Sequence, residues 1–197
     1  NKYDYTKGGA DKYFLNLSSA LEENGHEVYR YTMKTPKPLS RKLFWSKKAN
    51  EELKKILKEF QPDIAHVHNI YHDFSPSILF VLKKFKVPAV MTLHDSKIIC
   101  PNFKLYTQGS PCFRCKGGRF YNATRYRCLK NSYVLSAAAT AEAYAHQTFL
   151  KSYEKNIAVY ISPSRFMKKT FEDFGVKKKI IFLPNFVRVE KIKRNQK

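Results

Sequence analysis

Acidic residues are scarce in this sequence, and long apolar runs are absent from it. It contains 16 Asp and Glu against 37 Lys and Arg, which gives a formal net charge of +21 over 197 residues. An excess of this size favours an anionic partner, such as a phosphorylated substrate, an anionic membrane surface or a nucleic acid. No apolar run approaches the ~20 residues of a membrane-spanning helix. The first residues also lack the apolar core of a signal peptide.

Cysteine is missing from most of the chain, and all four cysteines fall in the segment 97–130. They are Cys100, Cys112, Cys115 and Cys128, spaced C-x11-C-x2-C-x12-C. A C-x2-C pair with two flanking cysteines can complete a tetrahedral zinc site. Without a secretory signal, a reducing compartment favours metal ligation over disulfides. We therefore favour a structural zinc ion, with two disulfides in any of three pairings, or free thiols, as the open alternatives.

Helical and strand patterns alternate along the rest of the chain. Helical spacing of apolar residues predicts helices at 10–23, 41–60, 76–85, 132–151 and 164–174. Short apolar runs predict strands at 28–32, 63–69, 88–93, 157–162 and 179–185. Such alternation is typical of an open parallel sheet with helices on both faces. We predict an α/β fold of this kind, with the cysteine-rich segment 97–130 as an insert.

Polar residues collect where the predicted strands end. They are His68, Asn69, His94, Asp95, Ser162, Ser164, Arg165 and Asn185. In open parallel sheets, ligands bind beyond the carboxyl ends of the strands. Any one strand-end histidine is more often structural, so the functional interpretation depends on the joint placement of these residues.

Gly8 and Gly9 precede the first predicted helix. Glycine lets a ligand approach the backbone closely, and a helix N-terminus offers free N–H groups to a phosphate. An ordinary turn is the alternative. No complete G-x-G-x-x-G is present, so a nicotinamide cofactor is not indicated.

Five segments together resemble a known family. They are KGGADKYFLNLSSALEENGHEV, PDIAHVHNIY, VPAVMTLHDSKIICPN, YISPSRFMKKTFEDFGV and IIFLPNFV. From Lys7 to Val187 the chain resembles the N-terminal half of retaining nucleotide-sugar glycosyltransferases with two Rossmann-like domains, the GT-B fold of glycosyltransferase family four. The resemblance implies a Rossmann-like, acceptor-side domain over 1–187 and a linker or tail over 188–197. It also implies a strand ahead of Asn1 and a C-terminal donor-binding domain, so we expect a fragment that transfers no sugar alone.

The resemblance also implies roles for individual residues. Gly8 and Gly9 match the loop that faces the donor's diphosphate, and His94, with Asp95, is the catalytic candidate. The candidates for acceptor binding are His68, Asn69, Lys97, Ser164 and Arg165. Transfer in this family needs no catalytic metal, and the donor is a UDP-, GDP- or ADP-linked sugar.

Basic and aromatic residues interleave in segment 97–130, which has no acidic residue. Such a surface suits a lipid-diphosphate acceptor or an anionic membrane. The stretch SRKLFWSKK suits a membrane interface, or packs as an ordinary amphipathic helix. We predict a glycan or lipid-linked acceptor, cell-surface polysaccharide synthesis, and a cytoplasmic location on the inner membrane face.

Two alternative functions stay open, namely a non-catalytic glycan-binding domain and a zinc-containing nucleic-acid-binding module. The second leaves the glycine loop and histidines unexplained, so nucleic acid is not our expected partner.

Overall fold

The protein has a parallel sheet at its centre. The structure is a computed structural model that describes residues 1, 3–32, 44–71 and 74–186. Its main sheet runs in the order β1 (Ala65–Val67), β2 (Ala89–Thr92), β5 (Val159–Ser162) and β6 (Ile180–Phe182). All three neighbouring pairs are parallel, so the carboxyl ends of these strands meet at one edge. This confirms the predicted α/β class and fits a Rossmann-like fold.

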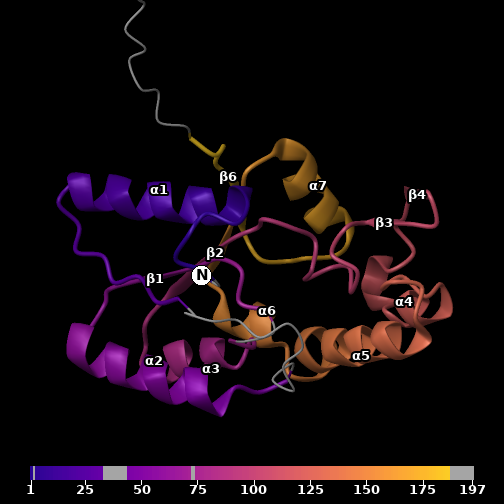
Figure 1. Ribbon diagram of the computed structural model, residues 1–197, viewed down its shortest axis with the longest axis horizontal. Helices are drawn as coiled ribbons and strands as arrows, with labels where there is room; N and C mark the ends of the chain where they lie inside the picture. The colour runs from indigo at the N-terminus through magenta and orange to yellow at the C-terminus, as the bar shows by residue number, and fades with distance from the viewer. Residues whose placement is uncertain (2, 33–43, 72–73, 187–197) are drawn as a thin grey trace, which may run out of the picture.

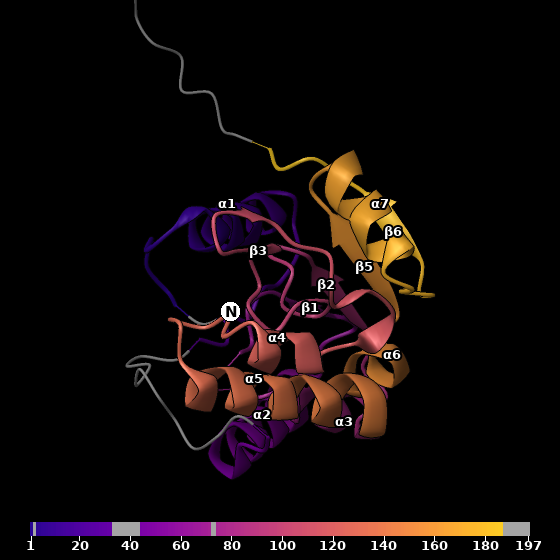
Figure 2. The same ribbon diagram turned by 90° about the vertical axis from the view of Figure 1, so that its right-hand side faces the viewer.

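Helices cover both faces of the sheet (Figures 1 and 2). On one face lie α1 (Gly9–Glu23) and α7 (Arg165–Asp173), and on the other lie α2 (Lys47–Phe60), α3 (Ile78–Lys84) and α6 (Ser152–Asn156). The core between these layers includes Leu79, Met91, Tyr160 and Phe171, which are almost completely buried. Burial of each such side chain stabilises the fold by about 1.5–3 kcal/mol, which explains why the strands are apolar runs.

Helix α2 begins at Lys47, later than the predicted start at Arg41. The side chain of Ser46 caps the helix, because its Oγ accepts a hydrogen bond from the backbone N–H of Ala49 at 3.4 Å. Two of our predictions fall outside the described residues: the start of this helix at 41–43 and the tail at 188–197.

The predicted strand at 28–32 is wrong. These residues are described and form no strand, and β1 is the edge of the sheet. A cavity of about 460 Å³ lies between them, lined also by α1 and α2. A strand needs a neighbouring ladder of hydrogen bonds. Among the described residues no strand lies between 28–32 and β1, so the extended chain has no such partner.

The single helix predicted over 132–151 is divided in the structure. Helix α5 (Tyr133–Ala143) is capped by Ser132, whose Oγ accepts from the N–H of Leu135 at 3.3 Å. It continues as a π-helix, η2 (Tyr144–Phe149), where the N–H of Leu150 bonds to the carbonyl of Ala145 at 2.8 Å. Lys151 has a φ of 49°, which ends the segment before α6.

Segment 97–130 lies beside the sheet and carries short elements of its own. They are the hairpin β3 (Tyr106–Thr107) and β4 (Ser110–Pro111), the 3₁₀ turn η1 (Lys116–Gly118) and α4 (Tyr121–Arg125). Helix α4 packs on α5. In the described part of the chain, no helix is both long and apolar enough to span a bilayer.

Candidate functional site

Two histidines from neighbouring strands meet at the carboxyl edge of the sheet. His68 follows β1 directly, and His94 follows β2 after one further residue. Their Nδ1 and Nε2 atoms lie 2.8 Å apart, and the rings stack with centroids separated by 5.1 Å. One nitrogen of this contact carries a proton and donates it, while the other accepts. The structure therefore brings together two residues that the sequence singled out separately.

A third histidine, which the sequence analysis missed, joins this pair. His66 stacks on His68 with ring centroids 4.5 Å apart, and its Nε2 lies 2.7 Å from Oγ1 of Thr92. Side chains two residues apart in a strand point to the same face. The His-x-His pattern formed by His66 in β1 and His68 directly after it was the signal that could have revealed it.

Burial keeps the three imidazoles neutral. It lowers the pKa of His66 and of His94 to about 4, and it moves the pKa of His68 well below the usual range. Neighbouring histidines lower the pKa of His66 and His68 further, whereas Asp11 partly opposes the shift at His94. A neutral imidazole offers one N–H donor and one acceptor nitrogen. At neutral pH the cluster can therefore orient a hydroxyl group, but it carries no positive charge.

Helix α1 and the segment after β6 complete this edge. The ring of Tyr13 packs edge-on against His94 at 5.7 Å and against Phe186 at 5.8 Å. Phe14 packs in the same way against His68 at 5.3 Å. These contacts place the first turns of α1 beside the histidines. In the sequence, Tyr13 occupies an ordinary core position of a predicted helix, and Phe186 lies near the end of the chain. The sequence patterns therefore did not identify either residue as part of the site.

Gly8 and Gly9 stand at the exposed start of α1. Gly8 is the N-cap in extended conformation, and its carbonyl accepts the N–H of Lys12 at 3.0 Å. A Cβ added at either glycine would meet no atom within 4 Å, and neither glycine has a positive φ. The fold itself therefore does not require glycine here. The first N–H groups of a helix have no intrahelical partner and can bind an anion.

Asp95 is held by its own turn. Its Oδ1 accepts the backbone N–H of Lys97 at 2.8 Å, and the hydroxyl of Tyr71 also donates to this carboxylate. Burial raises the pKa of Asp95, although these hydrogen bonds oppose the shift. The carboxylate thus shapes the turn after His94, and its catalytic role stays a prediction.

Lys97, a predicted acceptor-binding residue, has an internal partner. Its Nζ lies 2.8 Å from the carboxylate of Glu142 in α5, and the two side chains are only 10% and 5% exposed. The ammonium group also donates to the carbonyl of Pro101 at 3.4 Å. This ion pair fastens the turn after β2 to α5, so Lys97 is engaged structurally before any acceptor arrives.

The other residues predicted to bind the acceptor can also be placed in the fold. Ser164 caps α7, because its Oγ accepts the N–H of Met167 at 3.0 Å. The exposed guanidinium of Arg165 lies 5.0 Å from the ring centroid of Phe182. Asn69 follows His68 and is half-buried. Their binding roles stay predictions.

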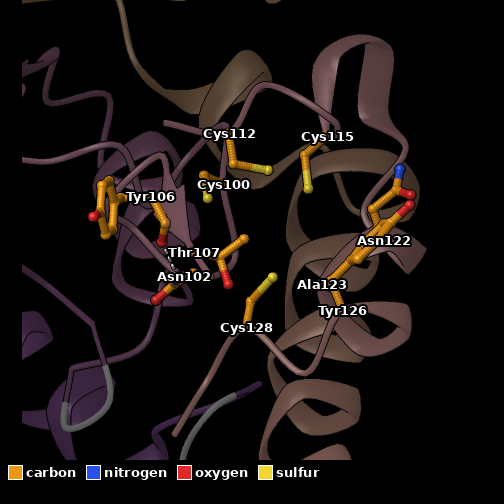
Figure 3. Close-up of a pocket in the computed structure, with 10 residues that line it drawn as sticks. All are labelled: Cys100, Asn102, Tyr106, Thr107, Cys112, Cys115, Asn122, Ala123, Tyr126 and Cys128. Atoms are coloured by element: carbon orange, nitrogen blue, oxygen red, sulfur yellow. Dashed lines mark hydrogen bonds between the residues drawn. The ribbon is translucent and has the colours of Figure 1, made fainter. Parts of the chain in front are cut away.

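The four cysteines surround a small cavity of about 10 Å³ (Figure 3). All four are free thiols in the structure. In the described part of the chain, no group of three or more His, Cys, Asp or Glu side chains already has an arrangement that could hold a metal ion. The zinc ion therefore stays a prediction.

Comparison with known proteins identifies a family that the chain matches. The model of a protein family described as Glycosyltransferase Family 4 matches residues 7–191. No curated protein and no solved structure gives a significant match.

Proposed function

We propose, since the chain belongs to Glycosyltransferase Family 4, that it is the N-terminal, acceptor-side domain of a retaining GT-B transferase. The enzyme moves a hexosyl unit from a nucleotide-sugar to a glycan or lipid-linked acceptor in cell-surface polysaccharide synthesis. The observation that carries this proposal is the hydrogen-bonded pair of His68 and His94 beside the start of α1. The pair lies at the carboxyl edge of a parallel sheet, where ligands bind in such folds.

The chemistry requires two kinds of stabilisation. Cleavage of the bond between the anomeric carbon and the diphosphate builds negative charge on the leaving group and positive charge on the sugar. In the proposal, the free N–H groups after Gly8 and Gly9 bind the diphosphate, supported by the helix dipole. His94, neutral and oriented by His68, contacts a sugar hydroxyl, and Asp95 holds the turn that carries His94. No catalytic metal takes part.

We place the acceptor along the edge between Asn69 and the start of α7. Several exposed aromatic rings lie in the neighbouring segment 97–130, namely Phe103, Tyr106, Phe113 and Tyr121. Eight Lys and Arg residues interleave with them. This combination supports a lipid-linked diphosphate acceptor and peripheral contact with the cytoplasmic membrane face. A second, donor-side domain would supply the remaining nucleotide contacts, so residues 1–197 alone are expected to be inactive in transfer.

A transfer assay tests this proposal. The transferase that carries this chain is incubated with radiolabelled UDP-, GDP- and ADP-sugars and with a lipid-linked acceptor extract. We expect one donor class to label the acceptor, and we expect His94→Ala to lower kcat by at least about 10²-fold. His26→Ala changes an exposed histidine and serves as the matched control. Full activity of His94→Ala would refute the site assignment. Glycan binding without transfer by any donor would favour the non-catalytic alternative.

A further inference from the structure

The four cysteines come from separate parts of one segment but face a single small space. Cys100 ends the turn after β2, Cys112 and Cys115 flank the turn after β4, and Cys128 follows α4. In Figure 3 their side chains surround the cavity, and the sulfur atoms of Cys112, Cys115 and Cys128 point toward its centre. A volume of about 10 Å³ is close to that of one water-sized sphere, so the space suits a single ion.

Hydrogen-bond donors are directed at these sulfur atoms. The backbone N–H groups of Leu105 and Asn102 bond to the sulfur of Cys100. The guanidinium of Arg114 donates to the sulfur of Cys112 at 3.5 Å, and the hydroxyl of Thr107 donates to Cys128. Sulfur is a weak acceptor when it is a neutral thiol or part of a disulfide. Several donors on one sulfur cluster are the surroundings that negatively charged thiolate ligands require.

The charge of the surrounding chain is also suited to an anionic centre. Between Asp95 and Glu142 there are eight Lys and Arg residues and no acidic residue. A divalent ion with four thiolates carries a net charge of about −2, which nearby cations stabilise. Arg114 is one example, because it contacts Cys112 and its guanidinium lies 4.2 Å from the ring centroid of Tyr126, which lines the cavity.

We propose that Cys100, Cys112, Cys115 and Cys128 bind one structural zinc ion as a tetrahedral tetrathiolate centre. Among the described residues, the thiols do not yet form a coordination shell. Rotation about the Cα–Cβ bonds must bring each sulfur to about 2.3 Å from the ion. The four thiols then release their protons to solvent when the metal binds. Two disulfides would satisfy the cysteines in pairs, but would leave the donors on the sulfur atoms without a charged acceptor.

The zinc centre fastens the segment that follows the candidate catalytic strand. The N–H of Cys100 bonds to the carbonyl of Ser96 at 2.8 Å, within the turn that begins at His94 and Asp95. Cys128 bonds through its own N–H to the carbonyl of Ala123 at 3.0 Å, and so lies against α4, which packs on α5. Bound zinc therefore connects the turn after β2 to the α4–α5 layer independently of the Lys97–Glu142 ion pair.

The metal content of the purified protein tests this proposal without an activity assay. The protein is produced in medium containing zinc, isolated without chelators, and analysed by inductively coupled plasma mass spectrometry. We expect about one zinc ion per chain. Replacement by Co²⁺ should give the thiolate charge-transfer absorption of a tetrahedral sulfur site. The four thiols should react slowly with a disulfide reagent, and at least about tenfold faster after chelation.

Variants assign the ligands. Cys112→Ser and Cys128→Ser should each weaken zinc binding by at least about tenfold, whereas Tyr106→Phe, which changes another residue lining the same cavity, should retain it. If the serine variants do not fold, the zinc content and the cobalt spectrum of the unmodified protein still decide the question. A reduced protein that folds without stoichiometric zinc would overturn the proposal. So would two disulfides found by mass spectrometry after rapid alkylation of the freshly isolated protein.

Discussion

His68 and His94 share a hydrogen bond of 2.8 Å that joins the ends of two neighbouring parallel strands. Only one of the two contacting nitrogens can carry the proton, so each ring determines the tautomer of the other. Burial keeps both rings neutral, and in the proposed function His68 orients His94 through this hydrogen bond. This relationship leads to the first prediction.

Replacement of His68 should impair transfer while leaving His94, the residue proposed to contact the sugar, in place. We expect His68→Ala to lower kcat by about 10²-fold with a smaller effect on KM, because His94 loses its orientation. His68→Gln, whose amide can also hydrogen-bond, should recover part of the loss. Steady-state kinetics of both variants, beside circular dichroism as a control for folding, measures this. Equal kinetics for Ala and Gln would argue against an orienting role.

The buried histidines should make the protein less stable in acid. Their pKa values are lower in the folded state, at about 4 for His66 and His94, than the usual 6.5. Between these values the unfolded chain binds more protons, so the free energy of unfolding is highest above pH 6.5 and falls as the pH drops toward 4. A shift of this size corresponds to roughly 3 kcal/mol per histidine.

Urea unfolding measured from pH 8 to pH 4.5 gives this dependence. His66→Gln, which can keep a hydrogen bond to Thr92, should show a shallower slope than the unmodified protein. The comparison is needed because burial also raises the pKa of Asp95, so this carboxyl group adds a pH dependence of its own. Parallel curves for the two proteins would contradict the assignment.

Removal of only one partner of the Lys97–Glu142 ion pair should strongly lower the stability of the fold. Lys97→Met leaves a carboxylate that is only 5% exposed without its partner, and we expect a loss of about 3–5 kcal/mol in the free energy of unfolding. The double variant Lys97→Met with Glu142→Leu should recover most of it, since no buried charge remains. Chemical denaturation of the single and double variants provides the cycle.

A surface pair is the control for that measurement. Lys168 and Glu172 lie 3.8 Å apart with at least 37% of each side chain exposed. Lys168→Met should therefore change stability by less than about 1 kcal/mol. If Lys97→Met and Lys168→Met lowered the free energy of unfolding equally, the buried ion pair would contribute no more to stability than the surface pair.

Gly9→Ala should separate stability from donor binding. Gly9 is the first residue of α1 with open space around it, so alanine should raise stability by about 0.5–1 kcal/mol. If the donor's diphosphate approaches this backbone, the new methyl group should raise the KM for the nucleotide-sugar at least about tenfold. Ser19→Ala, in the same helix but far from its start, should leave that KM unchanged. An unaltered KM for Gly9→Ala would remove the glycines from the donor site.

The central strands of the sheet, which helices cover on both faces, could be predicted from the sequence. Which segment forms the edge of the sheet could not be predicted. Residues 88–93 and 157–162 are mainly apolar, and they contain β2 and β5 at the centre of the sheet. Residues 28–32 carry a similar local signal, yet they form no strand because no described strand lies next to them. The helix predicted over 132–151 is present, but it is divided into α5 and the π-helix η2. Local spacing does not reveal the π-helical turn that places His146 in the interior, with its Nδ1 3.0 Å from the Oγ of Ser152.

The sequence by itself determined the class of fold and the edge of the sheet at which the polar residues collect. Both follow from local apolar periodicity and from the rule that parallel strands end on the same side. Only the tertiary structure decided which of those residues meet. It brought His68 into hydrogen-bond contact with His94 and placed the rings of His66 and Tyr13 beside this pair. It also formed the ion pair between Lys97 and Glu142, a residue 45 positions away. Such partners are chosen by burial, because a polar group removed from water must find its hydrogen bond wherever the packed chain provides one.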